Sequence, residues 1–354
     1  MSNPDATEAV DLKSLSEYDM IIDVRSPGEF AEDHVPGAVN LPVLDNEERA
    51  KVGTIYVQES RFLARRVGAA IVARNISRHL ETTLADRPAD FRPLVYCWRG
   101  GQRSNAMATV LAQVGWRTIV LTGGYRTYRR WAQRRLYEEP LGLKLVLLDG
   151  GTGSGKTEIL NRTAKLGLQT IDLEALAKHR GSLFGATSEP QPAQKMFESS
   201  LLRLFDGMDR TKPVLVEAES SKVGNRTLPP ALWQAMLEAP RIELAAPLPA
   251  RAAYLVRTYP DIIADRALLH DVLSQLAVYP GRKRLAAWSE LADAGLFHEL
   301  VSEVVERHYD PSYARSSRRD ERTKLATIEM AAVDEADLDA AARRVAGVLE
   351  RAAL

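Results

Sequence analysis

The feature that most constrains the fold of this chain is the segment GGTGSGKT, Gly150 to Thr157. It matches the pattern G-x-x-x-x-G-K-[ST], follows the apolar run LKLVLLDG and precedes KTEILNRTAKLG, which has helical spacing. Glycines let backbone N–H groups turn inward around phosphate oxygens, and the helix N-terminus adds the positive end of its dipole. The segment therefore predicts an α/β domain with a phosphate-binding loop.

The residues of this loop have expected roles in holding a diphosphate or triphosphate. Lys156 is expected to reach the terminal phosphates and Thr157 to ligate Mg²⁺. The group that the phosphates carry is recognised elsewhere in such proteins. The expected phosphate-binding residues are Gly150, Gly151, Thr152, Gly153, Ser154, Gly155, Lys156 and Thr157.

Four acidic residues after predicted strands are candidates for directing a metal. The strand VLVEAES places Glu217 and Glu219 where P-loop NTPases usually carry an Asp. Asp172 and Glu174 lie at the end of the segment LQTIDLE. They are either further acidic partners of the metal or carboxylates exposed to solvent at the end of a strand. The missing Asp argues against assuming that this chain hydrolyses ATP.

Length and patterning divide the 354 residues into two α/β domains. Apolar strands at MIIDV, RPLVYC and RTIVLTGG alternate with helical segments, which predicts a small parallel α/β domain over residues 1–138. Pro140 and Gly142 mark the boundary to a P-loop domain over residues 139–354. That domain continues with the strands PVLVEAES and RIELAAP and becomes mostly helical from about residue 261.

Composition restricts the class of protein. A single cysteine, Cys97, excludes an intrachain disulfide and a cysteine-built zinc site. The N-terminus lacks the features of a secretory signal, and no apolar run reaches the ~18 residues of a membrane-spanning helix, so a cytoplasmic protein without membrane contact is expected.

Charge is distributed unevenly although the net charge is zero. Residues 1–59 carry 4 Lys/Arg against 13 Asp/Glu, a charge of −9, and residues 60–135 carry 15 Arg against 3 Asp/Glu, a charge of +12. Either the two blocks neutralise each other across one fold, or the basic block attracts an anion.

The segment LVYCWRGGQRSN places Cys97 at a strand-to-helix turn. Backbone N–H groups at such a turn converge on one anion, and the helix dipole lowers the pKa of the thiol. A buried structural cysteine is the alternative, but two glycines and two arginines among the next six residues favour a thiolate with Arg103 as its catalytic partner. The expected anion loop consists of Trp98, Arg99, Gly100, Gly101 and Gln102.

Together, IIDVRSPGEFAEDHVPGAVNLP and VYCWRGGQRS resemble the rhodanese domain over about residues 10–135. The resemblance implies that Cys97 carries sulfur as a persulfide. It also implies a scaffold role for Asp23, Arg25, His34 and Gly37. Arg103 lies one position farther from Cys97 than in many single-domain rhodaneses. This C-x5-R spacing resembles the enlarged loop of rhodanese-fold phosphatases, which implies a tetrahedral, phosphate-sized anion.

A rhodanese-like domain fused to a P-loop domain resembles, over nearly the whole chain, the tRNA 2-selenouridine synthase family. Family-like segments are NEERAKVGTIYVQES, GGYRTYRR, DLEALAKHRGSLFG and VEAESSKVGN. The resemblance implies a transferase that exchanges sulfur for selenium at position 2 of a wobble 2-thiouridine, with selenophosphate as donor. It also implies geranylation of the same sulfur by geranyl diphosphate.

These activities imply two co-substrates and no prosthetic group, with Mg²⁺ at the P-loop. The P-loop would hold geranyl diphosphate and the Cys97 loop would hold selenophosphate. Alkylation turns the thiocarbonyl sulfur into a leaving thiol, so that selenium can attack C2. The implied partners are the anticodon arm of tRNA and a selenophosphate-producing enzyme.

The segment YRTYRRWAQRR interleaves five arginines with three aromatic residues. Such a composition is suited to gripping RNA phosphates and stacking on splayed bases. The alternative is an amphipathic linker helix packed by Tyr128 and Trp131. The expected tRNA-binding residues are Tyr125, Arg126, Arg129, Arg130, Arg134 and Arg135.

Two other functions are compatible with these motifs. A C-x5-R phosphatase or reductase with a regulatory nucleotide-binding domain would release phosphate from aryl phosphates without tRNA. A non-enzymatic nucleotide-gated sensor would keep its function after replacement of Cys97 by Ser.

Overall fold

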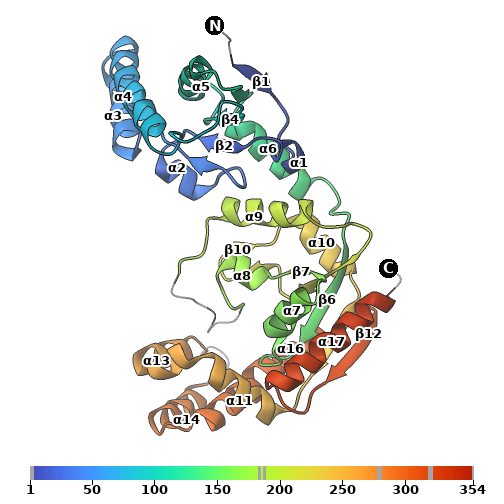
Figure 1. The fold of residues 1–354 in the computed structure, drawn as a ribbon. Coiled ribbons are helices and arrows are strands. Elements are labelled where there is room, and N and C mark those ends of the chain that lie inside the picture. Colours follow the sequence, from blue (N-terminus) through green and yellow to red (C-terminus); the bar gives the residue numbers. More distant parts are fainter. Residues whose placement is uncertain (1–3, 182–184, 186–188, 277–280, 318–321, 353–354) are drawn as a thin grey trace. The chain divides into compact units, whose positions relative to one another are not determined.

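The computed structural model describes residues 4–181, 185, 189–276, 281–317 and 322–352. The chain folds into two compact units. Figure 1 shows the ribbon, coloured along the sequence from blue to red. The first unit comprises Met1–Glu139 and Pro192–Gly207, and the second comprises Pro140–Gln191 and Met208–Leu354.

A parallel sheet of five strands is the centre of the first unit. Its strands are β1 (Asp5–Thr7), β2 (Met20–Asp23), β3 (Val39–Asn40), β4 (Pro93–Tyr96) and β5 (Ile119–Leu121). They lie in the order β1-β5-β4-β2-β3. The run PLVY of β4 is buried along its whole length, as is typical of a central parallel strand covered on both faces. The carboxyl end of β4 therefore delivers the next residue, Cys97, to the edge of a rigid sheet.

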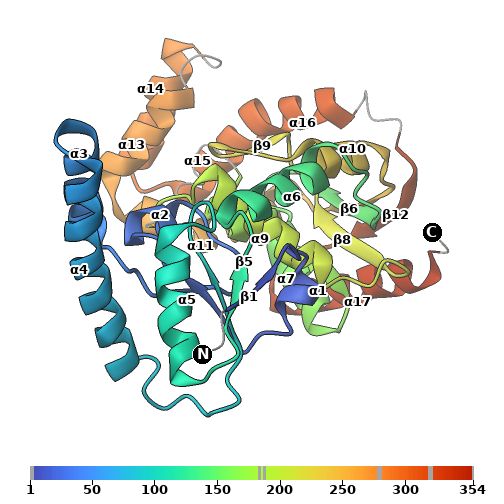
Figure 2. The same cartoon turned by 90° about the horizontal axis from the view of Figure 1, so that it is seen from above.

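Helices surround this sheet. They are α1 (Leu12–Leu15), α2 (Pro27–Glu32), α3 (Asn46–Gln58), α4 (Arg61–Glu81), α5 (Gln102–Val114), α6 (Tyr125–Tyr137) and α9 (Gln194–Asp206). α3 and α4 form a hairpin, and Figures 1 and 2 both show them side by side. Side-chain caps begin both helices, since Asp45 accepts from the Glu48 N–H at 2.7 Å and Ser60 accepts from the Leu63 N–H at 3.3 Å.

Helix α9 belongs to the first unit, whereas the sequence predicts a P-loop domain over residues 139–354 that would contain it. It packs on α6, where the Tyr128 hydroxyl lies 2.8 Å from Ser199 Oγ. Phe197 and Leu201 are fully buried on this helix. Its sequence shows an amphipathic helix, but helical spacing does not say which sheet or helix covers the apolar face.

A second parallel sheet of five strands is the centre of the second unit. Its strands are β6 (Lys144–Gly150), β7 (Gln169–Ile171), β8 (Pro213–Glu217), β11 (Arg241–Ala245) and β12 (Lys324–Glu329). Their order is β12-β11-β6-β8-β7. The strands β9 (Lys222–Val223) and β10 (Arg226–Thr227) form a separate, two-stranded antiparallel sheet. From β6 the chain goes first to β7 and β8 on one side and then to β11 on the other. The carboxyl end of β6 thus lies at a topological switch point, where open α/β sheets bind ligands.

Most helices of the second unit follow β11 in the chain. The helices of this unit are α7 (Lys156–Lys165), α8 (Leu173–Ala177), α10 (Pro230–Glu238), α11 (Leu248–Thr258), α12 (Pro260–Ala264), α13 (Arg266–Gln275), α14 (Arg282–Asp293), α15 (Phe297–Val304), the π-helix η2 (Val305–Tyr309), α16 (Asp310–Ser317) and α17 (Glu335–Arg351). The helices α12 to α15 share a core that includes Leu273, Trp288 and Leu300. Among the residues that the structure describes, no helix combines the length and the apolar character required to cross a bilayer.

The strand β12 interrupts the region that sequence analysis treated as mostly helical from about residue 261. It pairs in parallel with β11 at the edge of the sheet and is followed by α17, which packs on α7. Of its six residues only Ile328 is buried. The strand therefore lacks the alternation of buried and exposed residues by which a half-buried strand is recognised. Its place in the sheet depends on β11, a partner about 80 residues earlier.

Candidate functional site

Cys97 lies directly after β4, and its loop leads to the N-terminus of α5. The residue is 4% exposed. Its Sγ accepts the Gly101 N–H at 3.3 Å and lies 3.2 Å from Ser104 Oγ. Burial raises the pKa of the Cys97 thiol, but hydrogen bonds from Ser104 and from the backbone of Arg99 and Gly101 outweigh it and lower the pKa below its ordinary value. These hydrogen bonds act in favour of the thiolate that the loop sequence predicts.

The segment after β5 supports the back of the Cys97 loop. The Tyr125 N–H donates to the Cys97 carbonyl oxygen at 2.8 Å. A Cβ on Gly124, whose φ is +62°, would collide with that carbonyl oxygen and lie 2.5 Å from the Gly100 nitrogen. Gly100 has φ of +65°, and its own Cβ would lie 2.8 Å from the Gly123 nitrogen. The Cys97 loop and the turn after β5 therefore approach each other closely at their glycines, because a side chain at Gly100 or Gly124 would keep the two backbones apart.

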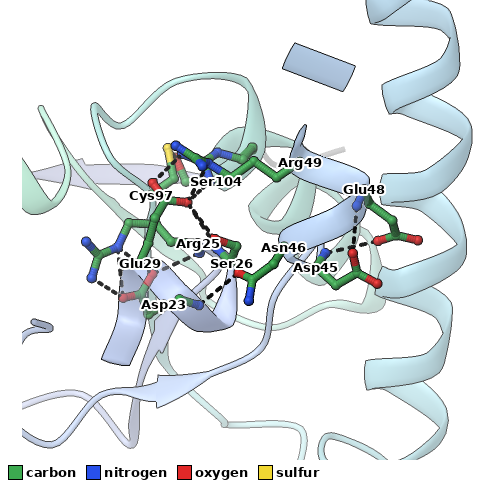
Figure 3. Close-up of polar contacts among 12 residues, drawn as sticks. Asp23, Arg25, Ser26, Glu29, Asp45, Asn46, Glu48, Arg49, Cys97 and Ser104 are labelled. Atoms are coloured by element: carbon green, nitrogen blue, oxygen red, sulfur yellow. Dashed lines mark hydrogen bonds and ion pairs between the residues drawn. The ribbon is translucent and has the colours of Figure 1, made fainter. Parts of the chain in front are cut away.

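Arg103 is held by Glu29 of α2, which sequence analysis did not single out. Arg103 Nη1 donates to Glu29 Oε2 at 2.8 Å, and Arg49 Nε lies 3.1 Å from the same oxygen. Figure 3 shows the Glu29 side chain between its neighbours Ser26 and Arg49. Burial raises the pKa of Glu29, but the hydrogen bond and charge of Arg103, with help from Ser26 and Arg49, lower it on balance. Glu29 is therefore an anion already bound to the expected anion-binding arginine.

An open hollow of about 470 Å³ lies over Cys97. Its walls bring together the predicted residues Cys97, Trp98, Arg99, Gly101, Gln102 and Arg103 with Glu29, Glu32 and Arg49. Gly100 is the one predicted loop residue that does not line this hollow. Arginines and inward N–H groups around a thiolate are suited to a tetrahedral anion.

Of the residues with an implied scaffold role, Asp23 and Arg25 are buried in the first unit, His34 is partly buried and Gly37 is exposed. Arg25 is buried, pairs with Asp23 at 2.6 Å and lies 4.1 Å from the centre of the Tyr125 ring. The His34 ring stacks on Phe30, with 3.7 Å between ring centres. These contacts hold α2 and its neighbours in place around the Cys97 loop.

The aromatic side of α6 is packed into the first unit, so Tyr125 as a base-stacking residue is wrong. Tyr125 and Tyr128 are buried, and the Tyr125 hydroxyl donates to Asp33 at 2.6 Å. Arg129 pairs with Glu198 of α9. The interleaved pattern that resembled an RNA-binding segment is therefore the amphipathic spacing of a helix with a buried face.

The other arginines of α6 lie nearer the surface. Arg126 and Arg130 are exposed. Arg134 and Arg135 both pair with Glu139, at 3.0 and 2.7 Å. Glu139 thus neutralises part of the positive charge expected to bind RNA.

A surface that combines aromatic rings with arginines that form no ion pair with a described residue lies at the α3–α4 tip, which we define as Tyr56, Val57, Arg61, Phe62 and Arg65. Phe62 is 75% exposed and Val57 82%. The Arg61 guanidinium lies over the Tyr56 ring, 5.5 Å from its centre. The basic block from residue 60 onward is evident in the sequence, but the exposure of these side chains is not, because helical spacing alone predicts that some of them are buried.

The P-loop joins β6 to α7 at the carboxyl end of the central strand. Gly153 and Gly155 have φ of +85° and +75°, which turns the loop tightly. Lys156 Nζ donates to the Gly150 carbonyl oxygen at 2.8 Å, so the lysine is folded over its own loop. The buried Ser154 hydroxyl has no hydrogen-bond partner among the described residues. These groups form a cradle of donors for phosphate oxygens.

The predicted acidic residues meet beside this loop. Carboxylate oxygens of Glu174, Glu217 and Glu219 lie within 4.8 Å of one another, and Thr157 Oγ1 donates to Glu174 Oε2 at 3.0 Å. Burial, followed by the charge of Glu219, raises the pKa of Glu174 to about 7. Burial and carboxylate neighbours likewise raise the pKa of Glu217. Asp172 caps α8 by accepting a backbone N–H at 2.7 Å.

A divalent cation fits this carboxylate cluster. One buried oxygen of Glu217 has no hydrogen-bond partner among the described residues. Oxygen ligands of this kind suit Mg²⁺, and its charge would relieve the repulsion that raises these pKa values. Thr157 and Glu174 are the residues placed to hold it.

Arg251 of α11 lies over the P-loop and was not predicted. Its Nη1 donates to the Thr152 carbonyl oxygen at 3.2 Å, and both Nη atoms donate to the Asp310 carboxylate at 2.8 Å. Asp310 fixes this guanidinium beside the phosphate loop and offsets its charge, so an incoming phosphate would meet a paired arginine. No sequence signal connects Arg251 with a loop about 100 residues earlier.

Comparisons with known proteins agree on both units. The family model of the tRNA 2-selenouridine synthase AAA domain matches residues 143–277, and that of the rhodanese-like domain matches residues 5–130. A tRNA 2-selenouridine synthase of Nitrosomonas europaea is 36% identical over 264 residues, which cover 73% of this chain and 68% of the relative. One from Bdellovibrio bacteriovorus is 37% identical over 68% of this chain and 64% of the relative. One from Salmonella typhi is 32% identical over 87% of this chain and 92% of the relative.

Proposed function

Because the chain belongs to the tRNA 2-selenouridine synthase family, we propose that it exchanges the sulfur of a wobble 2-thiouridine in tRNA for selenium. The proposed route has two steps, geranylation of the sulfur by geranyl diphosphate and displacement of the alkylated sulfur by selenium from selenophosphate. The observation that carries the proposal is the pair of distinct anion sites, a thiol loop in one unit and a phosphate loop in the other. A working thiol agrees with a reducing cytoplasm.

In the geranyl step, the thiocarbonyl sulfur attacks C1 of geranyl diphosphate. A C–S bond forms as the C–O bond breaks, and the diphosphate leaves. Lys156 and the inward N–H groups of the P-loop offset the charge on the leaving group, and Arg251 lies beside the same loop. Mg²⁺ held by Thr157 and Glu174 supplies further charge neutralisation when bound.

In the selenium step, the Cys97 thiolate attacks the phosphorus of selenophosphate. An S–P bond forms as the P–Se bond breaks, and selenide leaves with the electron pair. Selenide attacks C2 of the uracil ring and expels geranyl thiol, and water later hydrolyses the phosphocysteine to phosphate and thiol. The lowered pKa of Cys97 and the arginines around the hollow support this assignment, since they favour a thiolate and a tetrahedral dianion.

The experiment incubates 2-thiouridine tRNA with geranyl diphosphate, and separately incubates tRNA that is already geranylated with selenophosphate, and identifies the nucleosides of each reaction by mass spectrometry. Cys97→Ser is expected to abolish selenium incorporation and to leave geranylation intact, because the two chemistries use different units. A phosphorylated Cys97 peptide is expected in wild-type protein quenched with selenophosphate.

Selenouridine formed at the wild-type rate by the Ser variant would contradict the role of Cys97. Phosphate release from aryl phosphates without tRNA, together with unchanged nucleosides, would instead support a C-x5-R phosphatase. An unchanged nucleoside profile with full cellular function of Cys97→Ser would support a nucleotide-gated sensor.

A further inference from the structure

An apolar cavity of about 70 Å³ lies in the helical part of the second unit and reaches the P-loop. Thr152 of the P-loop forms one wall. Leu255 of α11 forms another and packs on the loop itself, because a Cβ at Gly153 would lie 2.9 Å from its Cδ1. The other walls are aliphatic and tyrosine side chains from α12, α13, α15 and η2, among them Leu273 and Val304. The cavity thus reaches the P-loop at Thr152.

The helix that closes the cavity has an unusual geometry. Residues Val305–Tyr309 form a π-helix, and both end residues line the cavity. π-Helical turns are rare and occur frequently at functional sites. This geometry is a second observation, independent of the volume, that points to a ligand.

The chemistry of the walls discriminates between ligands that a P-loop can hold. A nucleotide base carries several hydrogen-bonding groups, and each costs free energy when it is buried without a partner. Among the described lining residues, only Thr152, Tyr259 and Tyr309 have side chains with polar atoms. The volume accommodates roughly five to seven water-sized groups. A short hydrocarbon chain matches both properties, whereas a purine base matches neither.

We propose that this cavity binds the apolar tail of a short-chain prenyl diphosphate whose diphosphate lies in the P-loop. The inference rests on the proposed function, in which the P-loop holds a diphosphate ester. The distal isoprene unit fills the cavity, and the proximal unit lies along Leu255 toward Thr152. The tail then supplies affinity, and the loop positions the bond that breaks.

The experiment measures dissociation constants of the full-length protein with Mg²⁺ and inorganic pyrophosphate, geranyl diphosphate or ADP. Each buried methylene contributes about fourfold in affinity, so geranyl diphosphate is expected to bind roughly a hundredfold or more tightly than pyrophosphate. ADP is expected to gain nothing over pyrophosphate from this cavity.

Substitutions at Val304, which is 5% exposed and lines the cavity, test the site directly. Val304→Phe fills the cavity and is expected to remove most of the advantage of geranyl diphosphate while leaving pyrophosphate binding unchanged. Val304→Ala enlarges it and should shift the preference toward farnesyl diphosphate, which keeps the test valid if the Phe variant misfolds. Leu291→Phe is the matched control, because Leu291 packs on the same core without lining the cavity.

The outcomes separate this inference from the proposed function. Geranyl diphosphate binding no tighter than pyrophosphate, or an advantage that survives Val304→Phe, would show that the cavity is a packing gap. Tight ADP binding that Val304→Phe abolishes would assign the cavity to a base. The diphosphate role of the P-loop fails separately, if Lys156→Ala leaves pyrophosphate binding unchanged.

Discussion

Glu29 determines how the Cys97 pocket can receive an anion. Its carboxylate engages the guanidinium of Arg103 and the Nε of Arg49, so a selenophosphate dianion must compete with a charge already in place. Glu29→Gln removes that charge with little change in shape. Because a hydrogen bond to a charged group contributes about 1.5–3 kcal/mol, we expect the KM for selenophosphate to fall by about tenfold. Selenophosphate saturation curves measure this.

Glu32→Gln is the matched control, since Glu32 lines the same hollow but pairs with Lys195. If Glu29→Gln raises the KM instead, Glu29 positions Arg103 rather than competing for it. Arg103→Lys should then show the same defect. In either case Arg103→Lys is expected to impair selenophosphate use, because an ammonium replaces a two-oxygen contact by a point charge.

At the scale of elements, the turn between β5 and α6 determines the shape of the Cys97 loop. Gly124→Ala places a Cβ against the Cys97 carbonyl oxygen. Gly37→Ala is the control, because Gly37 has a similarly positive φ of +82° but nothing within 4 Å of its Cβ position. Both variants carry backbone strain, and only Gly124→Ala adds a clash. We expect Gly124→Ala to lower the free energy of unfolding in urea by about 1–3 kcal/mol more than Gly37→Ala does, and to slow selenium incorporation.

Equal stability of the two variants would mean that the loop shifts to admit the methyl group. Selenium incorporation would then decide the question. A stable Gly124→Ala protein with normal selenium transfer contradicts the view that this turn shapes the loop.

The α3–α4 tip is the element that we expect to contact tRNA. Its exposed rings and arginines suit stacking on unpaired bases and contacts to phosphates. Phe62→Ala is expected to weaken tRNA binding by roughly 1–3 kcal/mol, and Arg65→Ala should also reduce the salt dependence. Filter binding at several salt concentrations measures both effects.

Val114→Ala is the control, because Val114 is 53% exposed at the end of α5, outside the tip. Normal tRNA affinity of Phe62→Ala would exclude the tip as an RNA contact. An unchanged tRNA affinity combined with a new oligomeric state would indicate a protein interface instead.

At the scale of the whole chain, local motifs were predictable and distant partnerships were not. Cys97 and the P-loop are defined by neighbours within about ten residues, so their strand–loop–helix context was evident in the sequence. The pairing of Arg103 with Glu29 joins residues 74 positions apart. β12 and α9 show the same limit, because an edge strand and an amphipathic helix are recognised only by what covers them.

The presence of two separate sites makes a prediction for the whole molecule. Lys156→Ala should abolish geranyl transfer, because it removes a charge that offsets departure of the diphosphate. Losing one such preorganised donor typically costs roughly 3 kcal/mol, or ~10²-fold in rate. Selenium transfer from tRNA that is already geranylated should survive, since Cys97 lies in the other unit. Mass spectrometry of nucleosides from each half-reaction measures the two effects.

The rival expectation is an ATP-driven step at the P-loop, for which nucleotide would be indispensable to geranylation. Geranyl transfer in nucleotide-free buffer with Mg²⁺ separates the two. The carboxylate cluster favours the diphosphate site, because Glu217 and Glu219 stand where NTPases usually carry a metal-directing Asp. Absence of product without ATP would show that the loop binds a nucleotide and that geranyl diphosphate is held elsewhere.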